Sequence, residues 1–184
     1  MRAFIPLMLI LVAVAFAGCS SNPRVVEAET GPGFSRLHDV YEVHVLPVRL
    51  PDRISGQGGG EHNDQWHKTW PNEAARYVAD GITDRTMSRI MAVADVEKPR
   101  HGIYVEIVVR DYDVGARELR PPVHTVGGRA DWSRVLADAY IYDATTGELC
   151  ARLDIDQSSG AGDVLEADMT EIGKQIGAWL DRLN

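Results

Sequence analysis

A regular alternation of apolar and polar residues in the second half of the chain most constrains its fold. Apolar residues occupy every second position in 103–114, and again in 134–143 and 148–156, as is typical of strands that bury one face. The last two segments flank an Asp-Ala-Thr-Thr-Gly-Glu turn at 143–148, so they are expected to form a β-hairpin. The segments 103–114 and 134–143 are also consecutive strands, so they are expected to be neighbours in the sheet for the same reason. The pattern therefore predicts an amphipathic sheet with one face that must be covered.

Two amphipathic helices are available to cover that face. Residues 163–183 carry apolar side chains in steps of three and four, which is the period of a helix with one buried stripe. Asp163 and Glu166 stand at its start in a D-x-x-E arrangement similar to a capping box. Pro71 in a first turn indicates a second helix, which we expect over 69–93.

One further strand is expected over 41–50, where apolar and polar residues alternate until Pro47 breaks the pattern. The predicted order is β-α-β-β-β-α. Packing both helices on one face of a single sheet satisfies all these amphipathic segments. The sequence thus predicts an α+β fold with a mixed or antiparallel sheet, two helices on one face, and the other face wet.

The first residues have the layout of a secretory signal. Arg2 precedes an apolar run over 3–17, which is shorter than the ~20 residues of a membrane-spanning helix. Small residues then precede Cys19, as at a signal cleavage site. Residues 20–36 are rich in Pro, Gly, Ser and charge without apolar periodicity, as in a linker. We therefore expect a signal peptide over 1–18, a tether over 19–36 and one domain over 37–184.

Charge and cysteine content exclude several functional classes. The net charge is −8 and no Lys/Arg cluster stands out, so we expect no nucleic-acid partner, which would need a basic face. An acidic body also gains no electrostatic attraction to an anionic membrane. The chain has two cysteines, Cys19 and Cys150, which excludes a disulfide framework. An uncleaved anchor with these two cysteines paired remains an alternative to cleavage before Cys19.

A polar loop offers a candidate metal site. Imidazole and carboxylate groups gather within a few residues there and are ligands for zinc or copper; they are Glu61, His62, Asp64 and His67. The alternative is a solvated loop whose histidines are merely polar. Three consecutive glycines at 58–60 favour that alternative, because they leave the loop without fixed geometry.

A group of tyrosines on the strand faces opposite the aliphatic stripes offers a candidate binding surface. Tyrosine is favoured at recognition surfaces because it joins a large apolar ring to a polar tip. The four members are Tyr104, Tyr112, Tyr140 and Tyr142. The alternative is a face covered by long loops or occupied by ordinary cross-strand pairs.

Other patterns have less specific interpretations. Asp154 and Asp156, like the acids at 111 and 113, lie two apart on strands and could act as acid–base pairs, or simply pair with nearby arginines. Gly173 and Gly177 match G-x-x-x-G in the last helix, which indicates close contact with the sheet or with a helix of a partner protein. Cys150 is expected on the polar side of its strand, where it is either an exposed, reactive thiol or a small residue partly covered by a neighbouring loop.

The chain resembles a loose group of small bacterial envelope lipoproteins of unknown function. Their relatives include penicillin-binding-protein activator lipoproteins, the curli-secretion lipoprotein and the amino-terminal domain of the Tol-system β-propeller protein. Three segments carry the resemblance: the lipobox-like Ala17-Gly18-Cys19; the strand end at 111–115 followed by Arg117, Arg120, Gly127 and Gly128; and the strand and turn over 140–148.

The resemblance implies cleavage before Cys19, a diacylglycerol on its sulfur and an acyl chain on its new amino terminus. By analogy with enterobacterial lipoprotein sorting, Ser20 after the cysteine favours the outer membrane, with the domain in the periplasm. The resemblance implies no catalytic residues and no other cofactor. We therefore expect a lipid-anchored, non-catalytic adaptor or assembly factor that binds another envelope protein. The alternative is a metal- or small-ligand-binding lipoprotein that uses the loop at 61–67.

Overall fold

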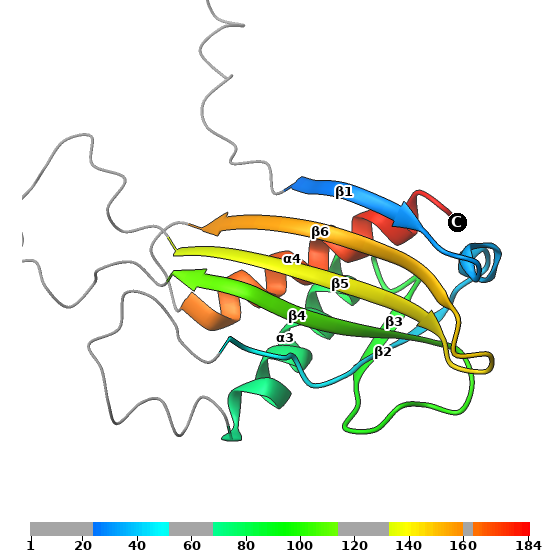
Figure 1. Ribbon diagram of the computed structural model, residues 1–184, viewed down its shortest axis with the longest axis horizontal. Helices are drawn as coiled ribbons and strands as arrows, with labels where there is room; N and C mark the ends of the chain where they lie inside the picture. Colours follow the sequence, from blue (N-terminus) through cyan, green and yellow to red (C-terminus); the bar gives the residue numbers. More distant parts are fainter. Residues whose placement is uncertain (1–23, 52–67, 114–132, 160–163) are drawn as a thin grey trace, which may run out of the picture.

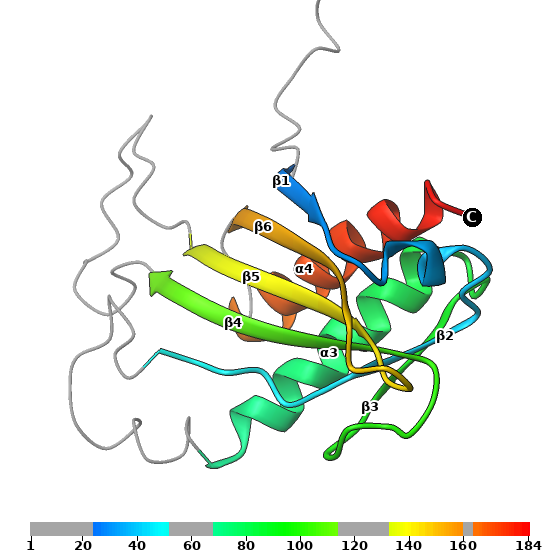
Figure 2. The ribbon, with the colours of Figure 1, turned by 45° about the vertical axis from the view of Figure 1, so that its right-hand side comes forward.

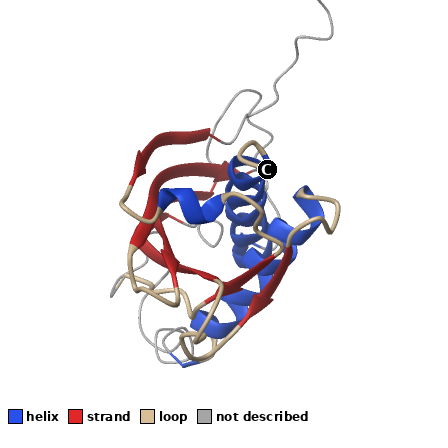
Figure 3. Ribbon diagram, turned by 90° about the vertical axis from the view of Figure 1, so that its right-hand side faces the viewer, coloured by secondary structure: helices blue, strands red, loops and turns tan. Residues whose placement is uncertain are grey.

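The computed structural model describes residues 24–51, 68–113, 133–159 and 164–184. They form a six-stranded mixed sheet in the order β1-β6-β5-β4-β2-β3, with two helices against one face (Figures 1 and 3). This confirms the predicted α+β class. The elements are β1 (Arg24–Thr30), a 3-10 helix η1 (Phe34–Leu37), β2 (Glu42–Val45), α3 (Trp70–Arg85), β3 (Met91–Ala94), β4 (Ile103–Asp113), β5 (Ser133–Asp143), β6 (Leu149–Ser159) and α4 (Val164–Asp181).

The centre of the sheet is the antiparallel β4-β5-β6 meander that the alternation predicts. β5 and β6 pair as a hairpin, and β4 pairs with β5 along its length. The hairpin turn closes through the Asp143 N–H, which donates to the Glu148 carbonyl at 3.0 Å. Gly147 has φ +73° in this turn, a conformation that glycine adopts without steric penalty.

The predicted helix over 69–93 is too long, because its last part is a strand. α3 ends at Arg85, and the Thr86 hydroxyl donates to the Ile82 carbonyl at 3.0 Å. Met87 and Ser88 then take φ of 50° and 61°, which reverses the chain. The following residues form β3, which pairs in parallel with β2. The apolar residues at the end of the expected helical stripe therefore belong to an edge strand.

The predicted tether over 19–36 is also wrong from residue 24 onwards. β1 pairs antiparallel with β6, and η1 follows it within the domain (Figure 2). Val25 packs against the core, and Leu37 is fully buried. The composition resembles a linker because an edge strand tolerates exposed charges on one face. Residues 24–36 therefore belong to the folded domain, which was expected to begin at residue 37.

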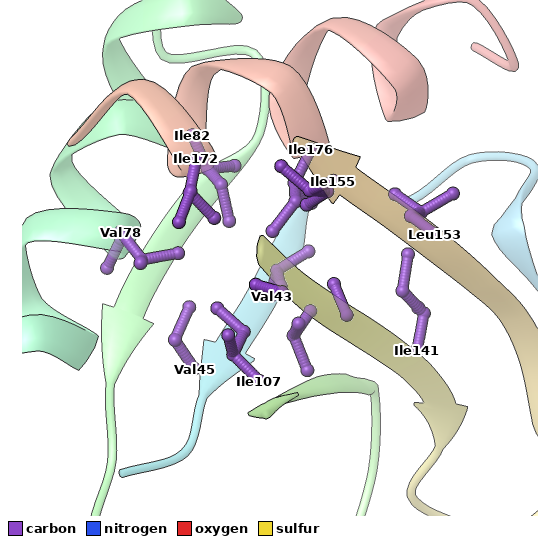
Figure 4. Close-up of a cluster of buried hydrophobic side chains, with 14 of the residues drawn as sticks. Val43, Val45, Val78, Ile82, Ile107, Ile141, Leu153, Ile155, Ile172 and Ile176 are labelled. Carbon is purple, nitrogen blue, oxygen red and sulfur yellow. The ribbon is translucent and has the colours of Figure 1, made fainter. Parts of the chain in front are cut away.

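The core lies between the sheet and the two helices. Aliphatic side chains from both layers meet there, including Val43, Ile107, Ile141, Ile155 and Ile176 (Figure 4). These are the inward residues of the alternating segments and the apolar stripe of α4. Burying these side chains together stabilises the packing of the helices on the sheet. The hydrophobic contribution is about 25 cal/mol for each Å² of apolar surface removed from water.

The two helices contact each other closely through glycines. A Cβ built on Gly173 of α4 would lie 2.1 Å from the Val78 carbonyl oxygen of α3, and one on Gly81 would lie 2.1 Å from the Thr170 carbonyl oxygen. Gly177 is less tight, with 3.0 Å to the Ile82 carbonyl oxygen. The G-x-x-x-G pattern therefore serves a helix–helix contact within the chain, rather than contact with the sheet.

Candidate functional site

Two of the four predicted tyrosines form a stacked pair on the sheet face away from the helices, here called the open face. Tyr104 and Tyr142 are cross-strand partners whose ring centroids lie 5.1 Å apart at 18°. The Lys98 ammonium lies 5.1 Å from the Tyr104 ring centroid and bonds to Glu106 at 2.7 Å. Tyr104 is only 4% exposed. Most of its apolar area is therefore used inside the chain and is not available to a partner.

Tyr140 lies beside a group of ion pairs at the middle of the open face. The Arg152 guanidinium is 5.9 Å from the Tyr140 ring centroid and 3.1 Å from the Asp138 carboxylate. Arg110 approaches the other oxygen of Asp138 at 3.3 Å. Asp138 is buried, so its charge is matched by two arginines, as a buried carboxylate requires.

The carboxylates at 154 and 156 have guanidinium partners, which supports their structural interpretation. Arg110 bonds to Asp154 at 2.5 Å, and Arg134 bonds to Asp156 at 3.0 and 2.6 Å. The bonds from Arg134 hold the pKa of Asp156 below its ordinary value of 3.8. A carboxylate held ionised in this way is a poor proton donor near neutral pH. The geometry thus favours cross-strand ion pairs over acid–base chemistry.

The prediction that Tyr112 lies on the open face is wrong. A bulge between Val109 and Asp111 leaves Arg110 without a pairing partner in β5 and shifts the alternation by one residue. Tyr112 therefore turns into the core, where it is fully buried and donates to the Asp168 carboxylate of α4 at 3.2 Å. Burial and the nearby carboxylate raise the pKa of the Tyr112 hydroxyl. A bulge moves every later side chain to the opposite face.

Tyr112 belongs to a buried polar cluster that connects the sheet to α4. Gln157 lies on the same cross-strand row, through Val135, and accepts a bond from the Gln175 amide at 2.8 Å. Asp168 and Gln175 are two turns apart on α4, so they face the same row. Sequence reasoning missed this cluster, although the two polar residues interrupting the inward face of α4 are a signal for it. Its geometry fixes how α4 lies along the sheet.

Cys150 lies at a bulge in β6 and is fully buried. A Cβ built on Gly33 would lie 2.9 Å from its sulfur, so the segment after β1 covers the thiol, as one of the sequence interpretations expected. Burial, with the nearby Asp143 carboxylate, raises the thiol pKa from 9.0 to about 11. Because the thiolate is the nucleophile, this environment suppresses reactivity.

We predict that iodoacetamide at pH 8 alkylates Cys150 in the native protein at least ~100-fold more slowly than in the protein unfolded in urea. Two pKa units lower the thiolate fraction by about that factor, and burial lowers the rate further. Mass spectrometry of the tryptic peptide that contains residue 150 measures the rate of alkylation in each state. Equal rates in the two states would contradict the burial of this thiol.

Exposed large apolar side chains gather at one edge of the sheet. Among the residues that the structure describes, they are Tyr41, Met87, Met91, Val93 and Val96. All five lie on β3 or beside it: the Met91 N–H, for example, donates to the Tyr41 carbonyl at 2.8 Å. Sequence reasoning missed this surface because the apolar residues at 90 and 91 continue the stripe of the preceding helix. We call these five residues the β3 surface.

The opposite edge of the sheet has a contrasting surface. β1 presents the exposed side chains of Glu27 and Glu29, and Glu29 lies 3.7 Å from Arg152. Charges on an edge strand are a common protection against pairing with other chains. The β3 edge lacks that protection, because its exposed side chains are apolar: Met91 is 51% exposed and Val93 is 46% exposed.

A cleft of about 420 Å³ lies between β3 and the adjoining flank of α3. Small side chains form its walls: Ala75 and Ala79 from α3, with Ala92 and Ala94 from the strand. Charged residues stand at its rim, namely Arg76, Asp80 and Asp95. The cleft is thus an apolar depression with a polar border, and Val93 and Val96 of the β3 surface also line it.

The remaining predicted site residues lie outside the described residues. They are the lipidation site Cys19 and the metal candidates Glu61, His62, Asp64 and His67. Within the described ranges, no group of three or more His, Cys, Asp or Glu side chains is placed to hold a metal ion. In the same ranges, no helix has the length and apolarity needed to cross a membrane.

Comparison with known proteins gives distant structural similarity only. No protein-family model matches the chain, and no curated protein matches it. The chain is similar to a PelC dodecamer from Paraburkholderia phytofirmans, with 11% identity over 82% of this chain and 95% of that one, at a TM-score of 0.46. It is also similar to XCC0632 from Xanthomonas campestris, assigned to the DUF330 family model, with 12% identity over 78% and 86% and a TM-score of 0.43.

Proposed function

We propose that this protein is a lipid-anchored, non-catalytic component of the bacterial cell envelope that binds another protein through the β3 surface. The observation that carries the binding role is the gathering of exposed apolar side chains at one edge strand. Contiguous apolar patches on a soluble domain mark interaction sites, because leaving them in water is unfavourable.

The anchoring part of the proposal rests on the sequence. Small residues precede Cys19 after a short apolar run, as in lipoprotein signals. A net charge of −8 gives the protein no attraction of its own to an anionic surface, so attachment would depend on the acyl chains. Two or more chains hold a protein stably at a membrane. We place the domain in the periplasm, on the outer membrane.

The non-catalytic part rests on the state of the polar groups on the open face. The carboxylates of Asp138, Asp154 and Asp156 each contact at least one arginine. Cys150 is buried, with its pKa raised. These groups therefore serve packing and charge balance in the folded domain, and the apolar β3 surface is the feature that folding leaves unused.

Site-specific photocrosslinking in the native cells tests this proposal. We expect p-benzoylphenylalanine in place of Val93 to give one discrete adduct with a different protein in the membrane fraction. The adduct should weaken at least fivefold when Met91→Ser is added, because the second change removes apolar contact from the same surface. Its recovery in the membrane fraction should be lost with Cys19→Ala, because no acyl chain can then be attached.

The matched control is the same photoreactive residue in place of Glu29, which is also exposed, on the opposite edge strand. No discrete adduct is expected there. Equal labelling from both edges, or no adduct from Val93, would contradict the binding role. An adduct of twice the chain's own mass would identify a second copy and contradict a different partner. A Cys19→Ala protein that stays in the membrane fraction would contradict the lipid anchor.

A further inference from the structure

We propose that the partner contributes an extended segment that adds beside β3 as a further strand, with apolar side chains on both of its faces and a basic residue opposite Asp80. This inference rests on the proposed function and names the class of partner segment. Three independent observations lead to it: the backbone groups that β3 leaves open, the apolar surfaces on its two sides, and the charge at the cleft rim.

The first observation concerns the backbone of β3. The Met91 N–H donates to the Tyr41 carbonyl at 2.8 Å, and the Asp95 N–H to the Val45 carbonyl at 2.9 Å. In a parallel ladder, residues at these alternate positions face the neighbouring strand, so those between them face away. Ala92 and Ala94 therefore present their backbone groups at the free edge.

Only one of these outward groups has a partner among the described residues. The Ala92 N–H donates to the Thr83 hydroxyl at 2.9 Å. The Ala92 carbonyl and both groups of Ala94 remain open, since β3 pairs with β2 alone in the described sheet. An added strand is the arrangement that satisfies such groups at regular spacing. A docked helix would leave them unbonded.

The second observation concerns the side chains beside that edge. Ala92 pairs with the buried Val43, and so lies on the helix side with the cleft. Met91 and Val93 pair with Glu42 and His44 on the open face. A strand added here would place alternate side chains into the alanine-walled cleft and the others against the exposed Met91 and Val93. Both of its faces would meet apolar surface, so its sequence should be apolar on both faces.

The third observation concerns charge at the cleft rim. The Asp80 carboxylate makes no hydrogen bond or ion pair with any described residue. Arg76 lies over the Tyr77 ring at 5.0 Å, and Asp95 lies 3.4 Å from His44. Asp80 is therefore the charged group at the cleft rim that is available to a partner. A Lys or Arg on the added segment would complement its negative charge. Such an exposed pair would add little affinity, but it would set the direction of the segment.

Peptide selection on the full-length protein in detergent tests the mode of binding. Random peptides of about twelve residues are selected against the wild-type protein, and the tightest is synthesised as the probe. We expect the selected peptides to be rich in Val, Ile, Thr and aromatic residues, with a Lys or Arg at a constant position. Fluorescence anisotropy of the labelled probe then gives its dissociation constant for each protein variant.

Two matched comparisons isolate the backbone contribution. Ala94→Pro removes the outward N–H and should weaken binding at least tenfold, whereas Ala94→Ser keeps it and should stay within about twofold. Proline is tolerated on edge strands where its nitrogen faces outward, and circular dichroism verifies that the variant is folded. Two further probes carry N-methyl groups on alternate amides, one on the odd and one on the even positions. Their dissociation constants should differ at least tenfold, because only one of the two sets of amides faces β3. Asp80→Lys should change the selected basic residue to an acidic one.

The outcomes separate this inference from the proposed function. Equal binding of both N-methylated probes, together with unchanged binding by Ala94→Pro, would overturn strand addition. If Met91→Ser still weakened the probe, the binding role of the β3 surface would stand. If Met91→Ser also left the binding of the probe unchanged, and position 93 gave no photocrosslink, both the strand addition and the proposed binding role would be overturned. Light scattering that shows a dimer dissociated by Ala94→Pro would assign the edge to a second copy and overturn the partner segment.

Discussion

Gly173→Ala is expected to destabilise the domain by about 2 kcal/mol, because its methyl group would enter the contact between α3 and α4. The added Cβ would lie 2.1 Å from the Val78 carbonyl oxygen and 3.0 Å from the Gly81 Cα. Both are backbone atoms, so relief requires the helices to separate along a surface that is otherwise closely packed. Overpacking in a core costs about 1–3 kcal/mol and occasionally more. The gain in helix propensity offsets only about 1 kcal/mol of this.

Urea unfolding followed by circular dichroism measures the loss of stability. Gly177→Ala is a graded comparison, since its nearest contact is 3.0 Å, and we expect a smaller loss. Lys174→Ala, on the same helix, is the control: it removes a half-buried ion pair with Glu171 and should change stability by less than about 1 kcal/mol. A Gly173→Ala protein as stable as the Lys174→Ala protein would show that the helices have room for the methyl group.

A chain that begins at residue 38 is expected to lose cooperative folding, whereas one that begins at residue 24 should keep it. The shorter chain lacks β1, which covers the edge of β6, and η1, which supplies the fully buried Leu37. It also lacks Phe34, whose ring contacts Trp179 edge-on with centroids 6.4 Å apart. Removing a buried leucine side chain alone costs about 2–5 kcal/mol, against a total of about 5–15 kcal/mol for a typical domain.

Thermal unfolding monitored by circular dichroism, with light scattering for aggregation, compares the two chains. The chain from residue 24 should show a single sharp transition. The chain from residue 38 should show a shallow transition or aggregate, because the edge of β6 is then open to pairing. A sharp transition at the same midpoint in both would mean that β1 and η1 contribute little to the fold, and that the domain begins where composition alone would place it.

The sequence predicted the elements whose amphipathic pattern is long and local. The alternation over 103–114 and 134–156 repeats enough times to identify β4, β5 and β6 and their hairpin. The stripe of α4 is equally regular. Because each of these segments must bury one face, their pattern also predicted two helices on one side of a sheet.

The candidate site was predicted less well, because it depends on pairings between distant segments. Of the four tyrosines, Tyr104 and Tyr142 did prove to be cross-strand neighbours, but their rings stack on each other. Tyr112 changed faces because one residue bulges in β4, and no periodicity in a single strand reveals a bulge. The β3 surface was hidden because four residues are too few to distinguish a strand from the end of a helix.

The amino-acid sequence by itself determined which segments are amphipathic, and hence the α+β class, the number of long helices and the central meander. Those properties depend on the spacing of neighbouring residues along the chain. Only the tertiary structure decided that residues 24–30 join the sheet, that Tyr112 is buried, and that β3 forms an edge of the sheet with apolar side chains exposed. These depend on backbone hydrogen bonds and packing between residues far apart in sequence, which local periodicity does not encode.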